Sequence, residues 1–517
     1  MTAAKEEEAL LLGAIDQGTS SSRFLVFNSA TGQLVSLHQI ELKQAFPRDG
    51  WVEMDATEML EATRQCMAQT ELKLKNMGLD PALVKAVGIT NQRETTVIWD
   101  VDTGRPLYNA IVWLDARTSQ LAQEYAQKTR SRKADHFQRL TGLPIHPYFS
   151  ALKIRWMMDN VPAVQKAIEN GKARAGTVDA WLIWNLTNGQ FLTDVTNASR
   201  TGLVNLATCT WDEEVCAFYG IPQEILPEIR SSAEVYGALA ATAPRGRTAN
   251  PFQNVPLAGC LGDQQAALVG QGCLTAGSAK NTYGTGCFML YNTGTKPVIS
   301  TNGLLTTVAF QLGTGKPVIY ALEGSIAIAG ACIRWLRDNL GIIKTSDEVE
   351  SLANSVSDNG GVYFVPAFTG LFAPHWRPEA RGVICGLSQF STKAHLARAA
   401  LEAVCYQTRE ILEAMRQDCG YPVELLQCDG GMTKNRSLMQ LQADILGSTV
   451  VQSAMAEATA LGAAIAAGTA LGLWDEAKVR PQLPLGQKFP PAMAEQVRNA
   501  QFAKWKQAVE KAIGDKL

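Results

Sequence analysis

The segment LGAIDQGTSSSRFLVF, residues 12–27, holds two apolar runs on either side of a short polar stretch. The first apolar run leads to Asp16, and the second begins at Phe24. Apolar runs separated by Gly and small hydroxyl residues are typical of two strands joined by a tight turn. The segment therefore predicts a strand, a turn and a second strand, with the polar chemistry gathered at the turn.

The residues of this turn allow two interpretations. Gly18 would let successive backbone N–H groups converge on an anion, and the following hydroxyls and Arg23 would add donors for phosphate oxygens. Asp16 would then be placed to hold a hydrated Mg²⁺. In the alternative, this is an ordinary hairpin in which Asp16 caps its own turn. The segment alone leaves both open.

Length and composition bound the class of protein. A chain of 517 residues is too long for one core and predicts two large domains, with a third left open. The hydrophobic fraction of 46% and charged fraction of 19% are those of a globular protein. A formal net charge of −2 argues against binding to nucleic acid or to an anionic membrane surface.

The cysteines and the apolar segments indicate the compartment. The 11 cysteines show no ligand-like spacing, which predicts free thiols in a reducing compartment and no structural zinc site. The first residues lack the pattern of a secretory signal, and no apolar stretch reaches the length of a transmembrane segment. We therefore expect a cytoplasmic protein.

Two halves of the chain repeat one α/β pattern. The first half continues with a strand at 34–42 and a buried strand at 84–90, and the second half begins with a strand at 257–262. A helix is expected over 325–340. The poorly patterned, proline-containing stretch 236–256 is expected to connect the domains. We therefore predict domains at residues 1–258 and 259–517, with a ligand cleft between them.

Four glycine-centred turns follow predicted strands. They are Asp16–Arg23, Gly262–Gln264, Tyr283–Gly286 and Asp429–Gly431. None matches the P-loop or the dinucleotide-binding fingerprint, and each by itself could be a sharp corner where backbones pack closely. Together, with a set in each half, they indicate a nucleotide held between two related domains.

Eight motifs in order carry a resemblance that runs from residue 12 to about residue 475. They are DQGTSSSR, GWVEMD, GITNQRETT, GTVDAWLIW, TNASRT, GDQQAALVGQ, NTYGTGCFML and ALGAA. The chain resembles the glycerol kinases, which belong to the FGGY carbohydrate kinases of the actin/hexokinase/Hsp70-like ATPase superfamily. The resemblance implies two actin-like (ribonuclease H-like) α/β domains with ATP and substrate in the cleft. It also implies Mg²⁺-dependent transfer of the ATP γ-phosphoryl group to glycerol, giving sn-glycerol 3-phosphate, by a homo-oligomer (dimer or tetramer).

The resemblance also implies an acceptor site in which Asp263 is the general base. Its other members are Arg93, Glu94, Tyr148 and Gln264, with Trp113 and Phe288 as aromatic walls. An aspartate within hydrogen-bond reach can take the proton of the attacking hydroxyl. The residues alone leave other roles open: a surface ion pair for Arg93 and Glu94, core packing for the aromatics, and a helix N-cap for Asp263.

For the nucleotide, the resemblance implies contacts on both domains. The residues are Thr19, Ser20, Ser21, Arg23, Thr285, Gly330, Gly431 and Asn435, with Asp16 for the metal. The chain departs from the family at Ser20, where threonine is commoner, and at Arg334, where bacterial relatives often have glutamine. The stretch 241–252 lacks the loop associated with fructose 1,6-bisphosphate inhibition, although Arg245 and Arg247 could still bind an anion.

Two other functions of the same superfamily are alternatives to a glycerol kinase. An FGGY kinase for a longer sugar, such as xylulose or ribulose, is disfavoured by NQRETT and Gln264. A non-catalytic ATP-dependent clamp or filament protein of the same superfamily would need no combination of Arg93, Glu94 and Asp263.

Overall fold

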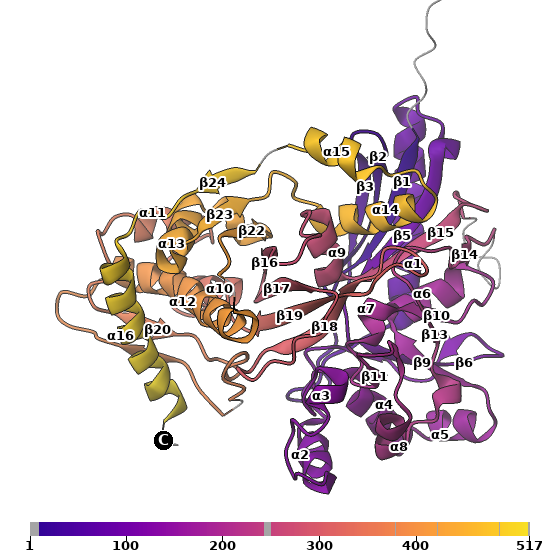
Figure 1. Ribbon diagram of the computed structural model, residues 1–517, viewed down its shortest axis with the longest axis horizontal. Helices are drawn as coiled ribbons and strands as arrows, with labels where there is room; N and C mark the ends of the chain where they lie inside the picture. The colour runs from indigo at the N-terminus through magenta and orange to yellow at the C-terminus, as the bar shows by residue number, and fades with distance from the viewer. Residues whose placement is uncertain (1–9, 242–249, 378, 421, 485, 515–517) are drawn as a thin grey trace, which may run out of the picture.

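The computed structural model describes residues 10–241, 250–377, 379–420, 422–484 and 486–514. Two lobes lie side by side in Figure 1, the first mostly in indigo to magenta and the second mostly in pink, orange and yellow. Each lobe is built on its own large sheet. This confirms the two-domain α/β architecture that the sequence predicted.

The sheet of the first lobe has the strand order β14-β15-β5-β1-β2-β3. Strands β1, β2 and β3 are antiparallel neighbours, whereas β5 and β15 extend the sheet in parallel with β1. The bounds are β1 Leu11–Gln17, β2 Ser21–Asn28, β3 Leu34–Glu41, β5 Val84–Asn91, β14 Gly237–Ala238 and β15 Pro256–Gly262.

The sheet of the second lobe has the order β18-β19-β17-β16-β22-β23-β24. Here β16, β17 and β19 are the antiparallel neighbours, and β22 and β23 run parallel to β16. The two sheets therefore share one topology over five strands, in which β16 corresponds to β1 and β22 to β5, whereas β18 has no counterpart in the first sheet. The bounds are β16 Ala279–Tyr283, β17 Cys287–Gly294, β18 Leu305–Phe310, β19 Ile319–Ile326, β22 Leu425–Asp429, β23 Thr449–Gln452 and β24 Gln487–Phe489.

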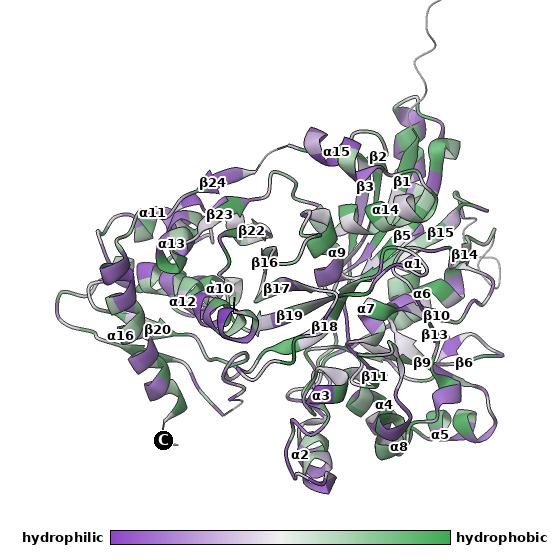
Figure 2. Cartoon of the chain, in the orientation of Figure 1, coloured by the Kyte–Doolittle hydropathy of each residue, from purple (hydrophilic) through white to green (hydrophobic). Residues whose placement is uncertain are grey.

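Both faces of the first sheet are buried. Leu12 and Ala14 of β1 point into the core that contains helix α14 (Ala458–Ala470), and Ile15 points into the core under helix α1 (Ala56–Asn76). Because a strand with two covered faces has no polar side, its sequence is continuously apolar. Figure 2 shows this as green along the central strands, whereas α16 (Glu495–Ile513) is mixed purple and green.

A pair of helices joins the lobes. Helix α14 comes from the second half of the chain but packs on β1, β5 and β15 of the first sheet, and it crosses α9 (Asp263–Gly270). The crossing is close, because a Cβ on Gly462 would collide with the backbone of Ala266. Apolar residues of the second sheet, Leu290 among them, complete the same core. The small residues of α14 therefore bring the two lobes into tight contact.

The remaining elements surround these sheets. In the first lobe they are β4 Glu53–Met54, η1 Pro81–Leu83, β6 Thr96–Asp100, β7 Arg105–Pro106, β8 Ala110–Ile111, α2 Ser119–Lys128, α3 Gln138–Thr141, α4 Ser150–Asn160, α5 Pro162–Glu169, β9 Ala173–Thr177, α6 Val178–Leu186, β10 Leu192–Asp194, α7 Val195–Ala198, β11 Val204–Asn205, β12 Thr210–Trp211, α8 Glu213–Tyr219, η2 Gln223–Ile225 and β13 Glu228–Arg230. Later in the chain come α10 Gly330–Asp338, α11 Glu348–Ala353, β20 Tyr363–Val365, β21 Val383–Cys385, α12 Lys393–Cys419, η3 Gly431–Lys434, α13 Arg436–Leu446, α15 Glu476–Val479 and η4 Arg480–Gln482. Each helix among the described residues is too short or too polar to cross a membrane.

Two expectations about the chain path need revision. The stretch 236–256 does not connect the lobes, because β14 and the start of β15 hydrogen-bond within the first sheet. The helix expected from Ser325 begins at Gly330, since Ser325 and Ile326 still pair with β17. The predicted boundary at residues 258/259 falls inside β15 and stays a prediction. Arg245 and Arg247 lie outside the described residues.

Candidate functional site

Buried hydrogen bonds tie three polar segments of the first half together. Asn91 and Asn197 exchange side-chain hydrogen bonds of 2.9 and 3.1 Å. The Thr196 hydroxyl accepts the Gly262 N–H at 2.8 Å, which fixes the residue before Asp263. The segments are NQRETT at 91–96, TNASRT at 196–201 and GDQQ at 262–265. The motifs that carried the resemblance therefore meet at one place.

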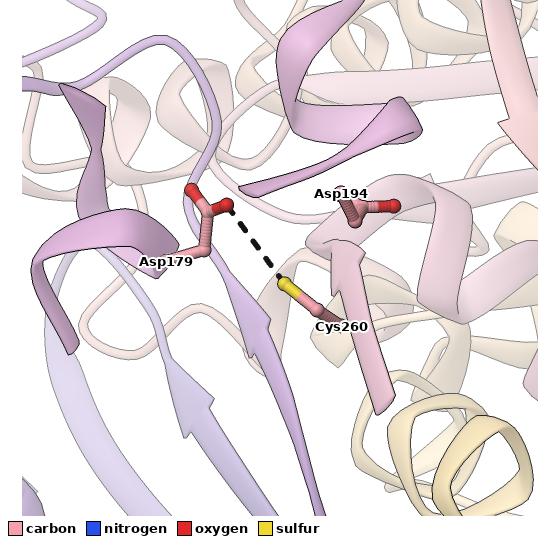
Figure 3. Close-up of side chains that lie close together, drawn as sticks. All are labelled: Asp179, Asp194 and Cys260. Atoms are coloured by element: carbon pink, nitrogen blue, oxygen red, sulfur yellow. Dashed lines mark hydrogen bonds between the residues drawn. The ribbon is translucent and has the colours of Figure 1, made fainter. Parts of the chain in front are cut away.

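A cluster of Asp179, Asp194 and Cys260 lies in the core beside these segments (Figure 3). Their ligand-type atoms lie within 4.8 Å of one another. The carboxylates are engaged by protein donors: Asp179 accepts from two threonine hydroxyls and from the Cys260 thiol, and Asp194 caps helix α7. Burial raises the pKa of Asp194 to about 7. We interpret the cluster as a polar core that anchors β15, the strand that ends at Asp263.

Arg93 is the centre of the expected acceptor site. Its guanidinium is buried and forms a two-pronged ion pair with Glu323, with distances of 2.5 Å from Nη1 and 3.0 Å from Nη2. Nη1 also donates to Gln265 at 3.4 Å, and Nε lies 3.1 Å from the Asp263 carboxylate. Because Arg93 sits in the first lobe and Glu323 on β19 of the second, this ion pair bridges the lobes. The surface ion-pair interpretation is therefore wrong.

Glu94 is held in an unusual backbone conformation. Its φ is 60°, in the left-handed region that non-glycine residues rarely adopt. The Arg200 Nε donates to Glu94 Oε1 at 2.6 Å, and both side chains are buried. Burial raises the pKa of Glu94, and the two nearby guanidiniums oppose that shift. The strain and the charged partner together fix the direction of this carboxylate.

Asp263 is the first residue of α9 rather than its N-cap, which is Gly262. Its side chain is 28% exposed, although its neighbours Arg93 and Gln264 are buried. Burial raises the pKa of Asp263, Arg93 and Lys280 lower it, and the nearby charge of Asp16 raises it. A partly open carboxylate between a guanidinium and an ammonium has the surroundings expected of a general base. The N-cap interpretation is therefore wrong.

Gln264 is directed by a buried lysine. The Lys280 ammonium donates to the side-chain oxygen of Gln264 and, at 2.9 Å, to the Thr282 hydroxyl. Burial lowers the pKa of Lys280 to about 8. The amide nitrogen of Gln264 is the end left to face a ligand.

Three aromatic rings line one side of this site and come from both lobes. Trp113 contacts Tyr148 and Phe288, each with 5.7 Å between ring centroids. The Arg93 guanidinium lies 6.0 Å from the centre of the Phe288 ring. The Trp113 indole N–H donates to the Thr19 hydroxyl at 3.0 Å, which connects the aromatic wall to the first turn. The structure thus brings the expected acceptor residues together.

Two details of the first hairpin turn differ from what the sequence suggested. Gly18 lies outside the left-handed region, and its N–H donates to the Ser21 carbonyl at 2.9 Å, so it closes the turn instead of facing an anion. Asp16 does not cap the turn but pairs with Arg23, its cross-strand neighbour, at 2.5 Å. Arg23 also contacts Glu457 at 2.6 Å. A phosphate bound by Arg23 would therefore compete with the Asp16 and Glu457 carboxylates for the Arg23 guanidinium.

A cavity of about 580 Å³ in the second lobe contains the other expected nucleotide residues. Thr285, Gly330, Gly431 and Asn435 all line it, and its volume is that of a typical small-molecule site. Arg334 also lines it and donates to the Thr285 hydroxyl at 3.2 Å. All its lining residues belong to the second lobe. The residues Thr19, Ser20, Ser21 and Arg23 lie on the first lobe instead.

The glycines around this cavity have two different roles. A Cβ on Gly330 would lie 2.6 Å from the Gly284 carbonyl oxygen, and one on Gly430, whose φ is 93°, would collide with the backbone of Tyr283. These glycines allow one turn to pack against another. A Cβ on Gly431 would meet no atom within 4 Å. The missing side chain of Gly431 therefore leaves room in the cavity.

Replacing Gly431 with valine should fill part of the cavity without disturbing the fold. We expect the Kd for ADP and the KM for ATP to rise about tenfold or more, by the usual effect of added methyl groups on a fitted pocket. The KM for the acceptor and the urea midpoint should stay unchanged. Isothermal titration with ADP measures the effect, and Gly431→Ala is the milder control. An unchanged Kd for ADP in the valine variant would exclude this cavity as the nucleotide site.

Sequence reasoning missed four charged residues of the site: Lys280, Glu323, Arg200 and Glu457. Glu323 interrupts the apolar run YALEGSI, and Lys280 lies in the buried strand AKNTY. A lone charge inside a buried strand needs a partner, and that signal could have marked both. Arg200 belongs to the quoted motif TNASRT, but its role there was not recognised.

Two similar lobes, a ligand-sized cavity in one of them and a partly exposed carboxylate beside Arg93 form the arrangement expected of a two-lobed phosphotransferase. The family model "FGGY family of carbohydrate kinases, N-terminal domain" matches residues 11–270, and the C-terminal counterpart matches residues 279–471. The chain belongs to the FGGY family of carbohydrate kinases. It is therefore a kinase, and the non-catalytic alternative is wrong.

Individual relatives agree over nearly the whole chain. A probable glycerol kinase of Caenorhabditis elegans is 51% identical over 98% of this chain and 99% of its own length. A glycerol kinase of Brucella anthropi is 52% identical, covering 97% and 99%. The crystal structure of Plasmodium falciparum glycerol kinase with ADP matches with a TM-score of 0.90 at 37% identity, covering 98% of this chain and 99% of that one.

Proposed function

We propose that the protein is an ATP:glycerol 3-phosphotransferase, which phosphorylates glycerol to sn-glycerol 3-phosphate in glycerol catabolism. The observation that carries the proposal is the partly exposed Asp263 carboxylate, held 3.1 Å from Arg93 Nε beside an aromatic wall built from both lobes. Such a site offers a short polyol one base, a few fixed hydrogen-bond partners and an apolar side for its carbon chain. The glycerol kinases among its relatives support the same acceptor.

Arg93, Glu94 and Gln264 would hold the acceptor hydroxyls. Among the described residues, the contacts of Arg93 use four of the five guanidinium N–H groups, which leaves one on Nη2 for a hydroxyl. Glu94 would accept a second hydroxyl, and the Gln264 amide would donate to a third. Trp113, Tyr148 and Phe288 would cover the carbon chain and exclude water, which limits wasteful hydrolysis of ATP.

Asp263 would take the proton from the terminal hydroxyl as that oxygen attacks the phosphoryl group. The base must be deprotonated to act, and Arg93 and Lys280 favour its charged form. The nucleotide would occupy the cavity lined by Thr285, Gly330, Gly431 and Asn435. Catalysis would come mainly from positioning and electrostatic stabilisation.

The phosphate end of the site would lie at the first hairpin turn. Thr19, Ser20, Ser21 and Arg23 would contact the transferring phosphate. Asp16 fits a hydrated Mg²⁺, because only one of its carboxylate oxygens is bonded to Arg23 and it lies close enough to influence the pKa of Asp263. The metal would neutralise charge on the phosphate oxygens.

We further propose a division of labour between residues 1–258, which bind acceptor and phosphate, and residues 259–517, which bind nucleotide and supply Asp263. The free thiols of all 11 cysteines support a cytoplasmic location. A homo-oligomer, either a dimer or a tetramer, is proposed by analogy with the family.

Release of ADP, measured by a coupled assay with a panel of acceptors, tests this function. We expect turnover with glycerol to exceed turnover with dihydroxyacetone, erythritol and xylulose, and almost no ADP release without an acceptor. A preference for xylulose would favour the rival sugar kinase. Equal ADP release with and without acceptors would contradict the proposed phosphoryl transfer.

A further inference from the structure

Four buried charges form a continuous chain across the two lobes. Glu323 of the second lobe lies between two arginines of the first: it is 2.5 Å from Arg93 Nη1 and 3.3 Å from Arg200 Nη2. Arg200 in turn contacts Glu94 through Nε at 2.6 Å. The side chains of Arg200 and Glu323 are 0% exposed. The order is Arg93–Glu323–Arg200–Glu94, so charges alternate and sum to zero.

Glu323 keeps its charge although it is buried. Burial alone would raise the pKa of its carboxyl, but Arg200 and Arg93 lower it to about 2. It occupies the middle of β19, where it is paired with β17 and β18 on either side. An anion fixed in this way can hold the Arg93 guanidinium in one orientation, in which its Nε edge faces Asp263.

Arg200 is held by Glu94 through Nε, whereas its Nη groups are only partly satisfied. Its guanidinium lies 5.5 Å from the centre of the Tyr148 ring and 5.4 Å from that of Phe149. Within the described residues, Nη1 has no hydrogen-bond partner, and Nη2 forms only the 3.3 Å ion pair with Glu323, without hydrogen-bond geometry. A buried donor without a partner destabilises a protein by about 1–3 kcal/mol, so its presence needs a reason.

We propose that Arg200 and Glu323 are positioning residues for the phosphoryl acceptor, a role that rests on the proposed function. Neither touches the acceptor, because neither is exposed. Glu323 acts through Arg93 by keeping its free N–H on the acceptor and its Nε on Asp263. Arg200 acts through Glu94 by engaging Oε1 and leaving the other carboxylate oxygen for a hydroxyl. The acceptor site is therefore assembled only when the two lobes are together.

The full-length variants Arg200→Met and Glu323→Gln test this role in steady-state kinetics. We expect the KM for glycerol to rise about tenfold or more in each, while the KM for ATP and the Kd for ADP stay within about twofold. The reason is that the nucleotide cavity is lined by other residues. Arg409→Met is the matched control, since Arg409 is also largely buried but contacts Glu413 and Asn499 in the second lobe.

The double variant Arg200→Met/Glu323→Gln removes one cation and one anion together. The charges of the remaining Arg93 and Glu94 still cancel. We therefore expect the fold-loss in kcat/KM of the double variant to be smaller than the product of the two single fold-losses. Arg200→Lys keeps the charge, but a single ammonium cannot contact both carboxylates as the guanidinium does. Its KM for glycerol should therefore lie between those of the wild type and of Arg200→Met.

Several results would overturn the proposal. One is an Arg200→Met variant that only lowers the urea midpoint, as Arg409→Met does, with both KM values unchanged. Equal rises in the KM for glycerol and for ATP would also overturn it. If Arg200→Met shows no cooperative urea transition and is therefore unfolded, the Arg200→Lys variant decides by the same comparison of the KM for glycerol with the KM for ATP. Failure of the proposed function would appear separately, because the wild-type protein would then not phosphorylate glycerol. In that case the KM for the acceptor that it does use is compared with the KM for ATP in the same variants.

Discussion

Asp263→Asn should lose turnover by about 10²- to 10⁴-fold, which is the usual contribution of a general base. Asparagine has nearly the same shape, so the contact with Arg93 and the start of α9 should persist. The amide cannot accept the hydroxyl proton, and the loss should therefore fall on kcat. A coupled ADP-release assay measures kcat, and isothermal titration with ADP measures whether the nucleotide still binds.

The pH profile of the wild-type protein gives a second readout for Asp263. Burial raises the pKa of its carboxyl above the ordinary value, and a general base works only when deprotonated. As pH falls through this raised pKa, kcat should fall, and the decline should begin at a higher pH than for an exposed aspartate. Asp263→Asn should abolish this acid limb. Near-normal kcat in the variant would show that Asp263 is not the base.

Arg93→Ala should weaken both the acceptor site and the fold. Removing one partner of a buried ion pair typically destabilises a protein by about 3–5 kcal/mol, and the Arg93 partner Glu323 is completely buried. We therefore expect a lower urea midpoint. A hydrogen bond to a charged group contributes about 1.5–3 kcal/mol, so the KM for glycerol should rise about 10- to 150-fold. Without the guanidinium, the pKa of Asp263 should rise further and shift the acid limb to higher pH.

Two comparisons make the Arg93 result interpretable. Arg93→Lys keeps a positive charge near Glu323 but loses the two-pronged guanidinium contact. Its urea midpoint should therefore fall only slightly below that of the wild type, whereas its KM for glycerol should still rise clearly. The KM for ATP should change much less than the KM for glycerol in both variants. Equal changes in the two KM values would mean that Arg93 faces phosphate or serves the fold alone.

Local pattern was enough to predict the elements that open each lobe. The apolar runs around Asp16 gave the first hairpin, and the strand leading to Asp263 begins and ends within two residues of the expected bounds. Alternation and turn residues are local properties of the chain, so a sequence displays them directly. The helix start at Gly330 was missed because pairing of Ser325 with Phe288, a tertiary contact, extends β19.

The partners of the site residues depend on contacts between distant segments. Glu323 is 230 residues from Arg93, and Glu457 is 434 residues from Arg23. Such pairs follow from how α9 and α14 bring the lobes together, and no local spacing announces them. The role of Gly18 was also misjudged, since its residue type suits several turns and only the Ser21 hydrogen bond shows which one forms.

The central claim is that Asp263 receives the proton of the hydroxyl that attacks ATP. A crystal structure of the protein with glycerol, Mg²⁺ and a non-hydrolysable ATP analogue tests it most directly. The claim predicts that the terminal hydroxyl oxygen lies about 2.6–3.2 Å from an Asp263 carboxylate oxygen and faces the γ-phosphate. A hydroxyl bonded to another group, with Asp263 beyond hydrogen-bond reach of it, would contradict the claim.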